Sequence, residues 1–362
     1  MGQKLSKQKI IDKYVGTPIN YTLRFLNYFK GKRNISKPKT IIIYKLDAIG
    51  DSILCLPMIK HLKEQTHAKI IIACSSNNLP IFKNHKFIDK IIVFDSSSFN
   101  PINLKTNIKE LKKEKADIAI DGAQSANISA ILSWLTAKTS IGFKKIEGSS
   151  RNKVYDYLIN LDPNKHMVYN YMDLLKPLRI KPKKKIELVP LHAKTITKKE
   201  NIVGIHPCNV LSYKAWPQKR WVKIIKHLAL KNEVVVVGSK EEASMVKKLL
   251  KKVNSKRVIN LSGRIDIESL IQLMPMFKLF IANDGGPMHL AASLGVPVIG
   301  IFGPETPVRY KPFTPKSISL YKPTKCSPCI KSYEDKIPGC DNPICMKNIT
   351  IQDIKRAIDK LI

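Results

Sequence analysis

Short runs of apolar, largely β-branched residues recur along most of the chain, and helical patterns lie between many of them. Such runs are typical of strands buried on both faces of a parallel sheet. The pattern fades after residue 137 and restarts at Asn201, so the alternation predicts two doubly wound α/β domains. The predicted strands are 41–44, 70–73, 91–94, 118–120, 202–206, 233–238, 258–261, 279–283 and 296–301. The predicted helices include 53–64, 125–137, 217–231, 240–253, 266–277 and 286–294.

The length of 362 residues agrees with two domains of ordinary size. The basic, Pro-containing stretch at 181–185 opens a predicted linker over residues 181–200. Ligands bind such sheets outside the carboxyl ends of the strands, so the strand ends are where functional residues are expected. The predicted organisation is a leader over 1–37, Rossmann-like domains over 38–185 and 200–350, and a C-terminal helix over 351–362.

The charge of the chain is strongly positive, with 63 Lys and Arg against 28 Asp and Glu and a formal net charge of +35. An anionic partner is therefore expected: nucleic acid, a phosphorylated lipid surface or a nucleotide-linked substrate. Aromatic residues make up only 7% of the chain, which argues against a surface that works by stacking single-stranded bases. No nucleic-acid-binding motif is present, so nucleic acid is not the predicted partner.

The leader 1–37 has two interpretations. Its aromatic and aliphatic residues between 21 and 29, interspersed with Arg and Lys, fit an amphipathic helix lying on an anionic membrane face. They also fit a helix packed on the first domain with a solvated basic face. The chain has no apolar stretch long enough to span a bilayer and no signal-peptide pattern at its start. A cytoplasmic protein, peripheral on the inner membrane, is the expectation.

The segment Lys45–Ser52 joins a predicted strand to a predicted helix. Gly50 permits a tight turn or the close approach of a ligand. In one interpretation Asp51 or Ser52 caps the following helix. In the other, the carboxylate of Asp51 faces the ligand and accepts a proton from a hydroxyl nucleophile. No G-x-G-x-x-G dinucleotide fingerprint is present here.

The segment Asn283–Pro297 is the most specific motif. A strand runs into Asp284, and Gly285 and Gly286 then bring the backbone close to a ligand. The helix that follows has unpaired amides at its start, which favour a diphosphate, and His289 lies in its first turn. Alternatively, Asp284 caps the helix and His289 is a satisfied polar side chain. The conjunction of an acid, two glycines and a histidine favours a binding site.

Two further strand ends carry candidate residues. Lys214 follows the strand 202–206 and would supply a point charge for a diphosphate, although it could equally be one of many solvated lysines. Glu241 and Glu242 follow the strand 233–238, where they could accept hydrogen bonds from a ribose or a sugar. The alternative is that they are ordinary acids at the start of a helix.

The seven cysteines fall into two sets. Three lie among apolar runs and are expected to be reduced core residues: Cys55, Cys74 and Cys208. Four lie near the C-terminus with spacings of two, ten and four residues: Cys326, Cys329, Cys340 and Cys345. These four could bind a structural zinc ion, remain reduced thiols or form a labile disulfide.

Taken together, these motifs resemble glycosyltransferase family 9, which includes the lipopolysaccharide heptosyltransferases. The resemblance covers about residues 40–350. It is carried by Lys45–Asp51, His206-Pro207, Lys214–Pro217, Asn283–Ala292, Phe302-Gly303-Pro304 and the cysteine-rich tail.

The resemblance implies a GT-B architecture, in which an N-terminal acceptor domain and a C-terminal nucleotide-sugar domain face a central cleft. It implies inverting, metal-independent sugar transfer from a nucleotide diphosphate, ADP-heptose in the best-known members, to a lipid-linked glycan such as the lipopolysaccharide core. Asp51 would be the general base and Lys214 would balance the leaving diphosphate. The donor sugar and phosphates would be bound by Asp284, Gly285, Gly286 and His289.

The residues themselves agree with this chemistry. Sugar transfer needs a base on the acceptor hydroxyl and stabilisation of the departing diphosphate. No Asp-x-Asp motif indicates a bridging divalent ion, and no cofactor is expected to be required. Two alternatives stay open: a basic nucleic-acid-binding protein, and a sugar-nucleotide epimerase or non-catalytic sugar-nucleotide-binding protein on the same scaffold.

Overall fold

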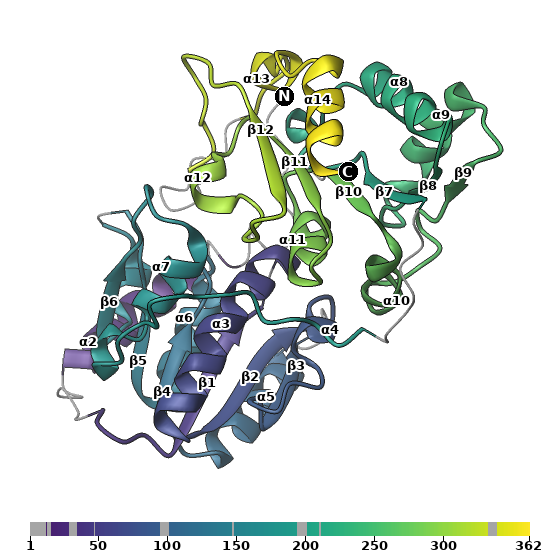
Figure 1. Cartoon of the computed structure of the whole chain (residues 1–362). Coiled ribbons are helices and arrows are strands. Elements are labelled where there is room, and N and C mark those ends of the chain that lie inside the picture. The colour runs from purple at the N-terminus through teal and green to yellow at the C-terminus, as the bar shows by residue number, and fades with distance from the viewer. Residues whose placement is uncertain are drawn as a thin grey trace. The chain divides into compact units, whose positions relative to one another are not determined.

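The computed structural model describes residues 12, 16–28, 35–46, 48–94, 101–146, 148–193, 201–209, 211–331 and 339–362 (Figure 1). The chain divides into two compact units, with the boundary between Ile186 and Glu187. This boundary falls inside the predicted linker 181–200. Each unit contains a parallel six-stranded sheet with helices packed on it, so the predicted α/β class with two doubly wound domains is confirmed.

The first sheet has the strand order β3-β2-β1-β4-β5-β6, and all of its pairings are parallel. The chain adds strands in one direction from β1 to β3 and in the other from β4 to β6. β1 and β4 therefore flank the switch point, where ligands bind in sheets of this kind. The strands are β1 Thr40–Lys45, β2 Lys69–Ser75, β3 Lys90–Phe94, β4 Ala116–Asp121, β5 Ala137–Lys144 and β6 Tyr157–Asn160.

The helices of the first unit cover both faces of this sheet. α5 and α6 pack on one face, where Leu111 and Leu132 meet Ile42 and Tyr44 of β1, and α3 lies on the other face (Figure 1). β1 is buried from Ile41 to Lys45 between these layers, as expected of a central parallel strand. The helices are α2 Gly16–Tyr28, α3 Ile49–Thr66, α4 Leu79–Phe82, α5 Pro101–Lys113, α6 Asn127–Thr136 and α7 Met167–Asp173.

The second sheet has the order β12-β11-β10-β7-β8-β9, again all parallel. Its switch point lies between β7 and β10. The strands are β7 Ile202–His206, β8 Glu233–Val236, β9 Val258–Asn260, β10 Leu279–Asn283, β11 Val298–Phe302 and β12 Ser317–Tyr321. The helices are α8 Gln218–Ala229, α9 Ala243–Val253, α10 Ile267–Leu273, α11 Gly286–Ser293, α12 Pro307–Tyr310, α13 Ile344–Lys347 and α14 Ile351–Leu361.

Two tryptophans help to build the core of the second unit. Trp216 and Trp221 are buried and meet edge to face, with 5.3 Å between ring centroids. The indole N–H of Trp216 donates to the carbonyl of Ile349, just before α14. These tryptophans are packing residues, and through this bond the C-terminal helix is tied to the segment that follows β7.

Three strands were not predicted, and each lacks the apolar run that marks a central strand. β5 buries polar residues, including Thr139 and Ser140. β6 and β12 are the last strands of their sheets, and neither contains a fully buried residue. A strand without several consecutive β-branched or apolar residues does not produce the signal on which the prediction rested.

The leader contains α2, which packs on the first unit. It contacts α6 and the short 3-10 helix η2 (Ser150–Lys153), and it buries Leu23 and Asn20. The amide of Asn20 donates to the side chain of Asn127 at 3.1 Å. The opposite face of α2 is apolar rather than basic at the described side chains. Within the described ranges, no helix is long and apolar enough to cross a bilayer.

Gly204 in the centre of β7 is expected to tolerate no side chain. A Cβ atom there would lie 2.6 Å from ring carbons of both Phe277 and Phe280. Gly204→Ala should therefore lower the free energy of unfolding by about 1–3 kcal/mol, measured by urea denaturation. Gly339→Ala is the control, because a Cβ there meets nothing within 4 Å. Equal stability of the two variants would contradict this packing.

Candidate functional site

Asp51 lies in the first turn of α3, directly after the switch-point strand β1. The N-cap of α3 is Ala48, which has a positive φ of 55° and makes no side-chain capping bond. The hydroxyl of Ser52 donates back to the carbonyl of Ala48 at 3.0 Å. The interpretation of Asp51 or Ser52 as a helix cap is therefore wrong. The carboxylate of Asp51 is left for other contacts.

Those contacts come from two other elements of the first unit. The hydroxyl of Tyr171 in α7 donates to Oδ1 of Asp51 at 2.9 Å. The side-chain amide of Gln124, in the loop after β4, donates to the same oxygen at 3.3 Å. Both bonds favour the ionised carboxylate, as does the position of Asp51 at the positive end of a helix. Tyr171 and Gln124 thus hold the carboxylate of Asp51 from within the first unit.

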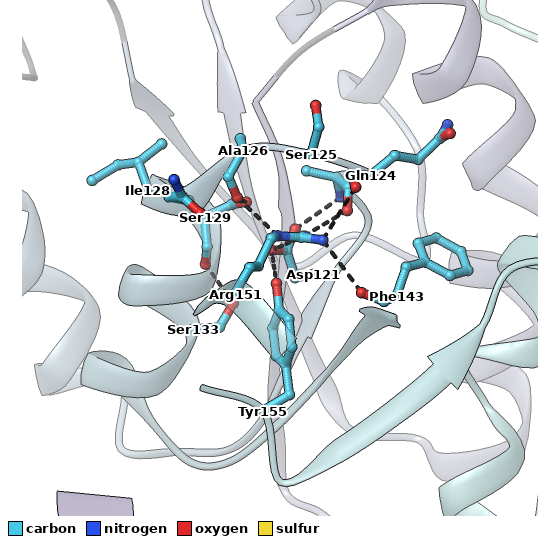
Figure 2. A network of polar contacts seen from close by, with 12 residues as sticks. Asp121, Gln124, Ser125, Ala126, Ile128, Ser129, Ser133, Phe143, Arg151 and Tyr155 are labelled. Atoms are coloured by element: carbon cyan, nitrogen blue, oxygen red, sulfur yellow. Dashed lines mark hydrogen bonds and ion pairs between the residues drawn. The ribbon is translucent and has the colours of Figure 1, made fainter. Parts of the chain in front are cut away.

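A buried ion pair fixes the loop that carries Gln124 (Figure 2). Arg151 and Asp121 have no exposed side-chain surface, and Nη2 of Arg151 lies 2.7 Å from Oδ2 of Asp121. The hydroxyl of Tyr155 donates to the same carboxylate oxygen at 2.5 Å. Burial raises the pKa of Tyr155 well above its ordinary value, which keeps this hydroxyl protonated as a donor.

The remaining donors of Arg151 hold the backbone after β4. They reach the carbonyls of Ala123 at 2.6 Å, Ala126 at 2.9 Å and Gln124 at 3.3 Å (Figure 2). A guanidinium with its donors spread over several carbonyls of one loop restrains that loop as a unit. The conformation of this loop is therefore set from inside the first unit.

The second unit holds a buried ion pair at its own switch point. Nζ of Lys214, which follows β7, lies 2.5 Å from Oδ2 of Asp284, which follows β10. The Lys214 side chain is only 16% exposed, so the interpretation as a solvated lysine is wrong. Burial opposes the charge of Lys214, but the attraction of Asp284 outweighs it, and the pKa of Lys214 is raised. Lys214 is therefore charged.

Two asparagines fix the segments that carry this pair. Asn283, fully buried at the end of β10, accepts from the backbone N–H of Trp216 and donates to the carbonyl of Cys208, both at 3.0 Å. Asn209 donates to the carbonyl of Asp284 at 2.7 Å. The loops after β7 and β10 are thus bonded to each other, which places Lys214 beside Asp284.

The backbone at the start of α11 fits the anion site that was predicted there. Gly285 is the N-cap and makes no side-chain capping bond, so the interpretation of Asp284 as the helix cap is wrong. A Cβ on Gly285 would meet atoms only at 3.8 Å, an ordinary contact distance. Packing within the protein therefore does not require glycine there. The amides of this first turn, with Gly286 at its head, favour an anion.

His289 and Glu305 lie around the ion pair and are both buried. Burial lowers the pKa of His289 to about 4, so the imidazole is neutral at pH 7. Burial raises the pKa of Glu305 to about 7, although Arg309 opposes this rise. Glu305, in the turn after β11, was given no role of its own from the sequence. Its charge acts on Lys214, which places it among the groups of the site.

The two glutamates after β8 differ in their surroundings. Glu242 accepts from the backbone N–H of Ser239 at 2.8 Å and contacts His206, at the end of β7, with 3.1 Å between Oε2 and Nε2. Glu241 is fully exposed. Glu242 is thus the carboxylate that reaches the switch-point strand, and donor binding by Glu241 stays a prediction.

The cysteines predicted to be reduced core residues are confirmed as buried, free thiols: Cys55, Cys74 and Cys208. The C-terminal four are also free, and Cys345 is the buried member. Within the ranges that the structure describes, no three His, Cys, Asp or Glu side chains are grouped as metal ligands would be. The zinc interpretation therefore stays a prediction, and nothing in the site described above depends on it.

Comparisons with known proteins agree on one family. The family described as glycosyltransferase family 9 (heptosyltransferase) matches residues 105–337. A lipooligosaccharide heptosyltransferase 2 from Campylobacter jejuni is 25% identical over 328 residues, which are 89% of this chain and 98% of that protein.

Two solved structures share the fold over 89% of this chain. One is the ADP-heptose lipopolysaccharide heptosyltransferase II of E. coli, with 18% identity, 98% of that chain covered and a TM-score of 0.72. The other is the E. coli heptosyltransferase WaaC with ADP, with 17% identity, 100% covered and a TM-score of 0.69.

Neutral, buried His289 should make stability depend on pH. An unfolded histidine has a pKa near 6.5, against about 4 in the folded protein. The unfolded state therefore binds more protons as pH falls from 6.5 towards 4. Stability is lost over that window by at most about 1.4 kcal/mol per pH unit.

The change His289→Asn should remove this dependence, so that the stability difference from the parent protein shrinks between pH 7 and pH 5 in urea unfolding. Glu305 titrates in both proteins and its contribution cancels. His67→Asn, at an exposed histidine, is the control. A difference that stays constant with pH would contradict the buried, neutral imidazole.

Proposed function

The chain belongs to glycosyltransferase family 9, as its motifs predict, and we propose that it transfers heptose from ADP-heptose to a lipopolysaccharide or lipooligosaccharide core. The observation that carries this proposal is the buried Lys214–Asp284 pair at the start of α11. It puts a cation beside unpaired helix amides, at the strand ends where a nucleotide would bind.

The donor diphosphate would be held by the amides at the start of α11 and by Lys214. A sugar leaving its nucleotide develops negative charge on the diphosphate, and these donors are fixed in place before it forms. Asp284 would then hold Lys214 in position and accept hydrogen bonds from the donor sugar, with neutral His289 beside it. Because the sequence contains no Asp-x-Asp motif, we assign this charge stabilisation to protein groups rather than to a bridging metal ion.

Glu242 would accept hydrogen bonds from the hydroxyls of the nucleoside. Its carboxylate lies at the end of the switch-point strand β7, beside His206, and ionised carboxylates accept hydrogen bonds from hydroxyl pairs. Burial opposes its ionisation, but bonds from His206 and Ser239 outweigh that effect and lower the pKa of Glu242. Glu242 is therefore ionised and ready to accept.

Asp51 would act as the general base. The acceptor hydroxyl gives its proton to the carboxylate as its oxygen forms a bond to the anomeric carbon of heptose. The bond from that carbon to the diphosphate oxygen breaks, and its electron pair leaves with ADP. Attack opposite the leaving group inverts the anomeric configuration.

The acceptor would be reached at an anionic membrane surface. The outward face of α2 is apolar: Phe25 is 67% exposed, and Ile19, Tyr21 and Leu26 are exposed with it. Nζ of Lys153 lies 4.8 Å from the ring centroid of Tyr21, so a cation borders this face. The leader 1–37 contains nine Lys and Arg and one Asp. Apolar side chains framed by basic ones are the composition that binds anionic lipid headgroups.

Two variants should separate donor binding from chemistry. Asp51→Asn should lower kcat by about 100-fold or more, with affinity for ADP unchanged, because it removes the proton acceptor. Lys214→Ala should weaken ADP binding by about tenfold or more, because a buried cation beside the diphosphate is lost. Calorimetry with ADP and turnover with ADP-heptose and a truncated core acceptor are the measurements.

Lys219→Ala, at an exposed lysine in α8, is the control for Lys214. Full activity of Asp51→Asn would exclude the base assignment. Binding of ADP without turnover of any sugar nucleotide by the unmodified protein would favour a non-catalytic binding protein instead.

Removing the apolar face of α2 should reduce membrane binding. Phe25→Ser with Leu26→Ser should lower the affinity for vesicles of phosphatidylethanolamine and phosphatidylglycerol by about tenfold, since each side chain loses an apolar contact with lipid. Leu230→Ser, at a residue 70% exposed in the second unit, is the control. Vesicle sedimentation measures the effect. Unchanged binding by the α2 variant would exclude this face as the lipid contact.

A further inference from the structure

Two buried elements of the first unit converge on one oxygen of Asp51. Tyr171 reaches Oδ1 from α7 and Gln124 reaches the same atom from the loop after β4. Neither residue belongs to the motif around Asp51, and they are 120 and 73 residues away in the chain. Two donors from separate elements restrict the rotation of the Asp51 side chain. They also favour the ionised form of its carboxylate.

Packing inside the first unit holds Tyr171 in place. Its side chain is fully buried and tilts against Phe143, with 5.8 Å between ring centroids. α7 packs along α3, the helix that carries Asp51. A buried phenol needs an acceptor, and a carboxylate is the strongest that the protein offers.

The network of polar contacts in Figure 2 holds the loop that carries Gln124. Arg151 donates to the carbonyl of Gln124 itself and to those of Ala123 and Ala126 in the same loop. Asp121 neutralises this guanidinium inside the unit. These bonds restrain the loop after β4, which carries Gln124.

We propose that Gln124 and Tyr171 are positioning residues that orient the carboxylate of Asp51 through Oδ1 and favour its ionised form. Two donors from separate elements reach that one oxygen. The inference rests on the proposed role of Asp51 as general base. It adds which side chains orient the base, as base catalysis requires a defined geometry towards the hydroxyl proton.

The step balances in this arrangement. The acceptor O–H bond breaks and its proton moves to the carboxylate of Asp51, while the acceptor oxygen bonds to the anomeric carbon and the diphosphate leaves with its electron pair. Tyr171 and Gln124 keep their protons throughout. As Asp51 becomes neutral, both bonds to Oδ1 weaken, so the protonated base readily returns its proton to solvent after the product leaves.

Tyr171→Phe tests the proposal, because it keeps the ring and removes only the donor. It should lower kcat by about tenfold with the KM for ADP-heptose unchanged. The bond favours the ionised carboxylate, so its loss should move the acid limb of the kcat–pH profile to higher pH, by up to about one unit. Gln124→Ala should act in the same direction and less strongly, since its bond is longer.

Other titratable groups near Asp51 are the same in the parent protein and in the variants. Cys55, one turn further along α3, has a pKa raised by burial to about 12 and stays neutral. Lys45, at the end of β1, acts on the same thiol and is not changed by either substitution. Tyr171→Phe removes only the hydroxyl that donates to Asp51.

The controls make the same chemical changes on the same helices. Tyr169→Phe alters an exposed tyrosine of α7, and Gln65→Ala an exposed glutamine of α3. Both should leave kcat and its pH profile unchanged. Thermal melting checks that Tyr171→Phe and Gln124→Ala remain folded at the assay temperature.

The proposal and the base assignment fail differently. If Asp51→Asn is inactive while Tyr171→Phe keeps both kcat and the parental pH profile, the positioning role is wrong and the base survives. If kcat falls but the acid limb does not move, Tyr171 is merely structural and the proposal is also wrong. If Asp51→Asn is fully active, the base assignment itself is wrong.

Discussion

In a parallel sheet every strand delivers its carboxyl end to the same edge, and in each unit two central strands lead the chain away from that edge in opposite directions. β1 and β4 do so in the first unit, and β7 and β10 in the second. Loops that diverge leave the edge uncovered between them, which is why polar side chains gather there. Asp51 and Gln124 come from one such pair of loops, and Lys214 and Asp284 from the other.

The charges that serve these edges are stabilised in two different ways. Arg151 and Asp121 are completely buried and satisfied by carbonyls and a phenol, so this pair is costly to break and is suited to holding a loop. The side chains of Lys214 and Asp284 are 16% and 7% exposed, and burial by itself lowers the pKa of the lysine. In the proposed function this small remaining exposure would let Lys214 interact with an incoming anion, whereas the guanidinium of Arg151 is closed off from solvent.

Much of this was predictable from the sequence, because central strands and the residues directly after them carry a local signal. The runs that became β1 and β10 led to Asp51 and to Asp284, Gly285 and Gly286. The local sequence pattern could not identify the residues from distant parts of the chain that contact Asp51. Tyr171 belongs to a stretch where the strand–helix pattern fades, and its role depends on α7 packing along α3. Gln124 could have been noticed as a polar residue after a strand. Glu241 and Glu242 are equivalent in sequence, and only the turn at Ser239 decides which one faces β7.

The lysine–aspartate pair also bears on the proposed role of the helix amides. In the proposed function Lys214 is paired with Asp284 before the donor binds, so part of its charge is offset. Neutral His289 adds no charge, and burial raises the pKa of Glu305 to about 7. The first amides of α11 carry no counter-ion, and they would add to the attraction of Lys214 for the diphosphate. Donors fixed in this way would interact most strongly with the diphosphate as it gains charge, which is the difference that lowers a barrier.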